Sequence, residues 1–208
     1  MSFVDRFIEE VDQGLRVLSG AVNAKRDEPH SAFEPRNIPV DKKNVSMRLM
    51  RVNHTGEVCA QALYSGQAFV ERDQRIKEEL LRSSEEEIDH LVWTRKRVID
   101  LGGKTSVFNV FFYLGSYSIG VCAGLAGSQH SLGFVEETER QVESHLSSHL
   151  GRLPPEDVKS LEIIKQMRRD EKSHGERAKN LGATDLPRVV KQAMKSVSKL
   201  MTGLTYYG

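Results

Sequence analysis

The spacing of apolar residues predicts helices along most of the chain. Apolar residues that alternate with polar ones, as in strands, are scarce, and the six prolines stand at 29, 35, 39, 154, 155 and 187. Proline disrupts the interior of a helix, so the stretches 40–153 and 156–186 are free to be helical. The pattern therefore predicts an all-α protein.

Amphipathic helices are expected near both ends, over 2–19 and 187–204. Two core helices are expected over 44–71 and 75–101, and Gly102 marks the end of the second. Residues 20–43 hold three prolines and show no helical period, which predicts a linker.

Two further core helices are predicted by stripes of residues spaced alternately three and four apart, which is the pattern of a packed bundle. The last stripe ends at Leu181, and Gly182 follows as its expected C-cap. The members of the first stripe are Cys122, Leu125, Ser128, Leu132, Val135, Glu139, Val142, Leu146 and His149, and those of the last are Ile164, Met167, Glu171, His174, Ala178 and Leu181.

Residues 105–129 form an uncharged segment that is aromatic in its first half and rich in glycine in its second. Its length alone would allow it to span a membrane. Its polar residues and four glycines argue against spanning, so burial or a position on a membrane surface is the stronger expectation.

A doubled motif predicts a metal site. Glu87 and His90 are three residues apart and therefore share one face of a helix, and Glu171 and His174 repeat the spacing. A lone candidate glutamate precedes each pair by about thirty residues: Glu57 precedes the first pair and Glu139 the second. Two lone glutamates and two Glu-x-x-His motifs, one group per helix, are the ligand set of a di-iron or di-manganese carboxylate bundle.

The glutamate on the third core helix has competitors, because Glu136, Glu137 and Glu143 lie close to Glu139. Glu139 alone falls in the apolar stripe, so it is the preferred ligand. Glu85 and Glu86, in contrast, are expected to be solvated. Carboxylates on the apolar face of a helix are costly to bury without a partner. A metal ion is a natural partner for them. His145 and His149 are left open as outer groups or surface residues.

Composition narrows the function further. The 208 residues carry a formal net charge of +1, so no basic field points to nucleic acid. Cys59 and Cys122 show no metal or disulfide spacing. The acidic residues among the first twelve are untypical of signal and transit peptides. The expectation is a bacterial cytoplasmic protein or an already processed chain.

Three segments closely resemble the demethoxyubiquinone hydroxylase family of ubiquinone biosynthesis. They are Arg51-Val52-Asn53-His54-Thr55-Gly56-Glu57, Glu86-Glu87-Ile88-Asp89-His90-Leu91 and Asp170-Glu171-Lys172-Ser173-His174, and the resemblance covers about 44–207. It implies a ferritin-like di-iron monooxygenase with two iron ions per chain that hydroxylates the ring of a polyprenyl demethoxyubiquinol with O2. The implied ligands are Glu57, Glu87, His90, Glu139, Glu171 and His174, and Glu87 and Glu171 are the expected bridges between the metals.

The residue pattern and the resemblance together suggest an organisation and a place for the protein. Residues 1–43 would form an N-terminal helix and linker, and 44–208 a ferritin-like di-iron domain with a C-terminal membrane-surface helix. That helix, over 187–204, is basic and apolar, which is typical of peripheral binding to a membrane. The expected location is the cytoplasmic face of the bacterial inner membrane, where other proteins of ubiquinone biosynthesis are candidate accessory partners.

Two other classes of function remain as alternatives. A ferritin-like ferroxidase or iron-storage protein would share the ligands, and a non-enzymatic membrane-associated scaffold would use the carboxylates only to hold a bundle. No glycine-rich dinucleotide motif follows a strand, so a reductant must reach the site from outside or through the quinone. The prenyl length, the electron donor and the oligomeric state are not set by the sequence.

Overall fold

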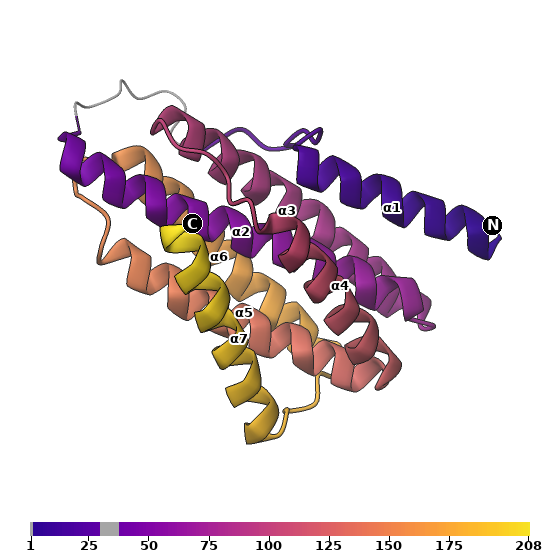
Figure 1. The fold of residues 1–208 in the computed structure, drawn as a ribbon. Helices are drawn as coiled ribbons and strands as arrows, with labels where there is room; N and C mark the ends of the chain where they lie inside the picture. The colour runs from indigo at the N-terminus through magenta and orange to yellow at the C-terminus, as the bar shows by residue number, and fades with distance from the viewer. Residues whose placement is uncertain (1, 30–37) are drawn as a thin grey trace.

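The computed structural model describes residues 2–29 and 38–208, and these form an all-α bundle (Figure 1). The predicted linker over 20–43 lies partly outside the described residues. Seven helices follow one another in this part of the chain: α1 (Phe3–Ser19), α2 (Val40–Val70), α3 (Gln74–Asp100), α4 (Asn109–Leu125), α5 (Ser128–Leu150), α6 (Val158–Asn180) and α7 (Arg188–Tyr207).

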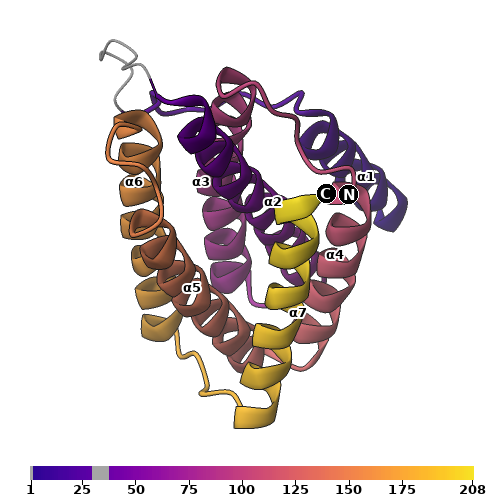
Figure 2. The same ribbon diagram turned by 60° about the vertical axis from the view of Figure 1, so that its left-hand side comes forward.

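The antiparallel pairs α2–α3 and α5–α6 form the four-helix core, which confirms the predicted fold class. Figure 2 shows the α5–α6 pair on one side of α2 and α3, α4 and α1 on the other, and α7 running across the front. Gly102 and Gly182 have positive φ angles of 81° and 100° just beyond α3 and α6. Both glycines therefore end their helices as predicted.

Helix α4 is the long return that brings the chain back along the bundle, and it packs along α2. The two helices approach closely at Gly66 and Gly120, where an added Cβ would lie 2.3 and 2.4 Å from a backbone oxygen of the other helix. This contact explains why the uncharged segment has a glycine at position 120. Among the described helices, none is both long and apolar enough to cross a membrane.

Two predicted boundaries were wrong. The stripe that began at Cys122 and Leu125 was assigned to one helix, but both residues belong to α4, because Gly127 has a φ of 106° and separates α4 from α5. Helix α2 begins at Val40 rather than at 44, directly after Pro39, whose fixed φ suits the start of a helix.

Two apolar clusters of the core lie on either side of a polar layer. One contains Met50, Trp93, Leu146 and Ile164, and the other contains Tyr64, Leu80, Leu132 and Ala178. Each core helix contributes to both clusters, and its residues between them face the polar layer. The packing thus fixes the helices on both sides of this layer, which is where the predicted ligands lie.

Candidate metal centre

Six side chains from the four core helices meet in the polar layer. None of them is more than 3% exposed. They are the six predicted ligands: Glu57 on α2, Glu87 and His90 on α3, Glu139 on α5, and Glu171 and His174 on α6.

The six residues form two overlapping groups, each of which could hold a metal ion. The first joins Glu57 and His90 to Glu87 and Glu171, and the second joins Glu139 and His174 to the same two glutamates. Within each group the candidate ligand atoms lie within 4.8 Å of one another. Glu87 and Glu171 belong to both groups, as the expected bridges do. The structure brings the six together, and their role as ligands stays a prediction.

The inner nitrogen and oxygen atoms of this cluster are arranged for binding a metal ion rather than for hydrogen bonds with one another. Glu87 Oε1, both carboxylate oxygens of Glu171 and His174 Nδ1 are buried and make no hydrogen bond within the described chain. His174 Nδ1 nevertheless lies 2.9 Å from Glu87 Oε1 and 3.2 Å from Glu171 Oε2. Donor and acceptor are thus close without the alignment of a hydrogen bond. Buried polar atoms that converge in this way fit the ligands of an ion.

The charges of the site lead to the same conclusion. Burial raises the pKa values of Glu57 and Glu139 well above the usual range, and the carboxylates of Glu87 and Glu171 add to the effect. Burial also opposes charge on Glu87, but His90 and His174 hold its pKa well below the usual range. Without cations, protons would have to balance the charge of this site. Two divalent cations would balance the four carboxylates without them.

Each histidine is oriented by an acid on the opposite helix. His90 Nε2 lies 2.9 Å from Asp170 Oδ2 of α6, and His174 Nε2 lies 2.8 Å from Glu86 Oε2 of α3. Both Nδ1 atoms therefore face the inner carboxylates. An acid that holds the outer nitrogen of a ligating imidazole fixes its tautomer and its ring plane.

These outer acids were missed by the sequence analysis, and the expectation that Glu86 is solvated was wrong. The Glu86 side chain is 36% exposed but bonds both His174 and Arg177. The hydrogen bond from His174 is the main cause that lowers the pKa of Glu86 to about 2. A signal was present, since Glu86 directly precedes Glu87 and Asp170 directly precedes Glu171. Glu85 is exposed, as expected.

The phase of α5 agrees with the preference for Glu139. Glu139 is 3% exposed and accepts a hydrogen bond of 2.5 Å from the buried Tyr64 hydroxyl, while Glu136 and Glu143 are half-buried. Glu137 is buried too, but it pairs with Arg140 at 2.6 Å and faces α7 rather than the metal centre.

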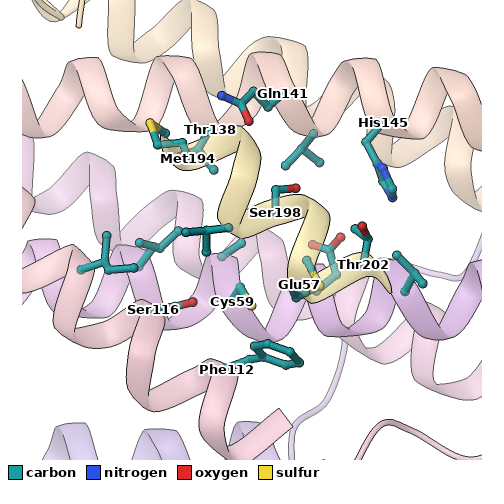
Figure 3. A pocket seen from close by; sticks show the side chains of 18 of the residues that line it. Glu57, Cys59, Phe112, Ser116, Thr138, Gln141, His145, Met194, Ser198 and Thr202 are labelled. Carbon is teal, nitrogen blue, oxygen red and sulfur yellow. The ribbon is translucent and has the colours of Figure 1, made fainter. Parts of the chain in front are cut away.

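An apolar cavity of about 330 Å³ lies beside the centre, between α2, α4, α5 and α7. Glu57 belongs both to its wall and to the candidate ligands. Figure 3 shows Phe112, Met194 and Ser198 around the space, with His145 at one side. A ligand in this cavity would contact one candidate metal ligand directly and would be enclosed largely by apolar side chains.

The chain matches the family model described as "Ubiquinone biosynthesis protein COQ7" over residues 44–205. The chain belongs to the COQ7 family. A protein of Chromobacterium violaceum named 3-demethoxyubiquinol 3-hydroxylase is 47% identical over 203 residues, which are 98% of both chains. Relatives of the same name in Polynucleobacter necessarius and Legionella pneumophila are 49% and 47% identical and cover 98–99% of each chain.

The COQ7 model covers all six candidate ligands, both outer acids and most of α7. It does not cover α1 or residues 20–29. The matches to bacterial COQ7 relatives reach over 98–99% of this chain and so include most of this N-terminal part. The segment before residue 44 is therefore shared with whole relatives, although it lies outside the common family region.

His145 and His149 form a second imidazole pair in this COQ7 chain, with ring centroids 4.0 Å apart. His145 reaches the cavity, while His149 is 1% exposed and lies behind it. Burial, then His145 and Arg152, lowers the pKa of His149 to about 3. Burial likewise lowers the pKa of His54 to about 4. The imidazoles of His149 and His54 are therefore neutral in the folded protein near neutral pH.

We expect stability to fall as the pH drops below about 6.5, the usual pKa of an unfolded histidine. Below that pH the histidine of the unfolded chain binds a proton, whereas buried His149 of the folded protein stays neutral. The contribution of neutral His149 to the free energy of unfolding is therefore complete above that pH and is lost as the pH falls toward about 3. His149→Gln should reduce the difference in unfolding free energy between about pH 7 and about pH 5 by on the order of 1–3 kcal/mol. Urea unfolding at about pH 7 and about pH 5 measures the difference. The exposed His130 provides the control, and an equal flattening in His130→Gln would contradict the assignment.

Proposed function

We propose that the chain is a 3-demethoxyubiquinol 3-hydroxylase that uses two iron ions and O2 to hydroxylate the quinol ring. The observation that carries the proposal is the shared wall between the apolar cavity and the six-residue cluster, at Glu57. Family membership and the names of relatives along the whole chain support the same reaction. A storage protein would have no use for such a cavity.

In this proposal Glu57 with His90 and Glu139 with His174 would hold one ion each, and Glu87 and Glu171, which belong to both groups, would contribute to both sites. Carboxylates and imidazoles suit iron in such sites and leave positions open for exchangeable ligands. When bound, a reduced iron pair would supply two electrons for the activation of O2, and an external reductant or the quinol would restore them. One oxygen atom would enter the ring C–H bond, and the other would take up two protons and leave as water.

The residues of the chain position the substrate and keep water away. A flat ring in the cavity would lie against α2, next to Glu57, and the apolar walls would exclude solvent from its reacting edge. Asn53 and His145 are polar residues among those that line the cavity. Amide and imidazole side chains form hydrogen bonds with a hydroxyl, so a small reorientation of either side chain would let it hold a quinol hydroxyl and turn the ring toward the centre.

The reaction is tested by the source of the new hydroxyl oxygen. We expect isotope-labelled O2, and not labelled water, to deliver its label to the product, because the proposed reaction splits O2 between ring and water. Mass spectrometry of the quinone after turnover measures the incorporation. Cells whose only copy is Glu57→Ala should accumulate demethoxyubiquinol. Label that arrives from water would contradict the monooxygenase even in a protein loaded with iron.

We also propose that the protein binds the surface of the bacterial inner membrane from the cytoplasmic side, where its prenylated substrate resides. Helix α7 exposes Val189, Val197 and Leu200, and its charged residues are all basic. Helix α4 exposes Phe111 and Leu114 beside the same cavity. Basic and apolar helices of this kind bind at the interface of anionic membranes. The prenyl tail could then stay in lipid while the ring enters the cavity.

The membrane proposal predicts that the protein sediments with vesicles that contain anionic lipid and is partly released by high salt. Lys195→Glu together with Lys199→Glu should lower the bound fraction, since each basic residue near the surface contributes about 1 kcal/mol. Both side chains are exposed. If the protein stays in the supernatant when the vesicles sediment at low salt, surface binding is contradicted.

A further inference from the structure

Both outer acids of the metal centre are held by an arginine, but the two arginines come from different parts of the chain. Glu86, which orients His174, pairs with Arg177 of α6 at 2.7 Å. Asp170, which orients His90, pairs with Arg26 at 2.9 Å. Arg177 belongs to the core bundle. Arg26 lies in residues 20–29, the segment after α1, which we call the N-terminal strap.

The Arg26 guanidinium contacts groups around His90, although 40% of the side chain is exposed. Its Nε lies 2.6 Å from Asp89 Oδ2, and its Nη1 lies 2.9 Å from Asp170 Oδ2. The guanidinium also stacks over the Trp93 ring at 4.9 Å from the centroid. One planar side chain thus joins α3 to α6 across the outer face of the histidine. A guanidinium can serve two carboxylates at once in this way, which a lysine ammonium cannot do with the same geometry.

The N-terminal strap is attached to α3 at several points that do not involve the Arg26 side chain. Arg95 donates to the Ser19 carbonyl at 2.7 Å, and Lys96 pairs with Glu28 at 2.7 Å. The backbone N–H of Lys25 donates to Asp89 at 2.6 Å. Gly20 has a φ of 75°, and the Arg95 guanidinium occupies the place that a Cβ would take. The strap therefore has anchors of its own, which leaves the contact between Arg26 and Asp170 free for another role.

We propose that Arg26 is a positioning residue for one of the two metal ions, the one held by Glu57 and His90. By fixing Asp170 it fixes the ring plane of His90, and so the N-terminal strap completes a site whose ligands all lie in the core bundle. The other ion, held by Glu139 and His174, depends on Arg177 instead. The inference rests on the proposed di-metal function.

The size of the effect follows from the behaviour of outer residues at metal sites. Removing a group that orients a ligating histidine typically weakens metal binding about 10- to 100-fold. Arg26→Gln should therefore weaken one of the two binding steps by that factor and leave the other unchanged. Arg26→Lys keeps the charge but cannot bridge Asp89 and Asp170, so we expect an intermediate loss.

The experiment titrates the metal-free full-length protein with Mn(II) and follows binding by electron paramagnetic resonance. A coupled pair and an isolated Mn(II) ion give different spectra, so the readout is independent of turnover. Wild-type protein should bind two ions as a coupled pair, and Arg26→Gln should show isolated Mn(II) at concentrations that saturate the wild type. Lys25→Gln is the matched control: it removes the neighbouring exposed ion pair with Glu85 but keeps the backbone bond to Asp89.

A double substitution identifies the ion that is affected. Glu57→Ala should already lack the first ion, so adding Arg26→Gln should change its remaining affinity less than twofold, whereas adding Arg177→Gln should weaken it 10- to 100-fold. If Arg26→Gln binds both ions with wild-type affinity and only its melting temperature falls, the arginine merely fastens the strap and the inference is wrong. If the wild type itself binds no metal pair, the proposed function fails instead.

Discussion

Replacing Glu87 or Glu171 by alanine is expected to remove both iron ions, whereas replacing Glu57 should remove one. Each of the first two residues belongs to both ligand groups, and Glu57 belongs to a single group. Iron per chain should fall from about two to near zero for the shared residues and to about one for Glu57→Ala. Elemental analysis of protein that is loaded anaerobically with Fe(II) measures these values.

Helices α3 and α6 provide the controls. Glu85 is exposed on α3 and pairs with Lys25 at 2.6 Å, and Glu176 is exposed on α6, with 65% of its side chain accessible. Alanine at either position removes a carboxylate from the same helix without touching the centre, so the iron content should stay at the wild-type level. Full iron content in Glu87→Ala and Glu171→Ala would refute the di-iron centre, and equal loss in Glu57→Ala would refute the assignment of shared ligands.

Glu139→Ala should abolish hydroxylation, while Glu136→Ala and Glu143→Ala should retain most of it. The reason is the phase of α5, which buries Glu139 between Tyr64 and the second ligand group and leaves the other two half-buried. The three variants lose the same functional group from the same helix within seven residues, and so they differ mainly in where that group points. Turnover of a short-chain demethoxyubiquinol together with iron content measures the difference.

Folding must be separated from metal loss in this series. Circular dichroism should show the same helix content for the three variants, because none of the glutamates caps α5. Activity that survives in Glu139→Ala and is lost in Glu136→Ala would mean that α5 is rotated relative to the assignment made here. Glu137→Ala is a different case, since it releases Arg140 and Lys191 and should affect the seating of α7 rather than the iron.

The convergence of the six candidate ligands could be predicted because helical spacing and the apolar stripe decide which faces of the helices they share. Glu87 and His90 are on one face of any helix that contains both, and the apolar stripe placed Glu139 inward. Helix ends at Gly102 and Gly182 were also predictable, since glycine adopts positive φ without strain. These features depend on local geometry and on the periodic pattern, which the sequence contains directly.

The outer contacts could not be predicted in this way. Glu86 meets His174 across 88 positions of sequence, and Arg26 meets Asp170 across 144. Such pairs depend on how two helices and a connecting segment are placed, which no spacing rule gives. The break at Gly127 was missed for a related reason: several glycines stand nearby, and only the packing of α4 on α2 decides which of them adopts the positive φ.

Helix α7 forms one wall of the cavity but is itself barely packed, since Thr205 is its only buried residue. Its hold on the bundle is concentrated near its ends, where Arg51 donates to the carbonyls of Thr205 and Tyr206 at 2.9 Å and Lys191 lies 3.8 Å from Glu137. Elements with few buried contacts open at a small fraction of the free energy of global unfolding. The cavity can therefore exchange its contents through local opening of α7, while the four helices that carry the candidate ligands stay folded.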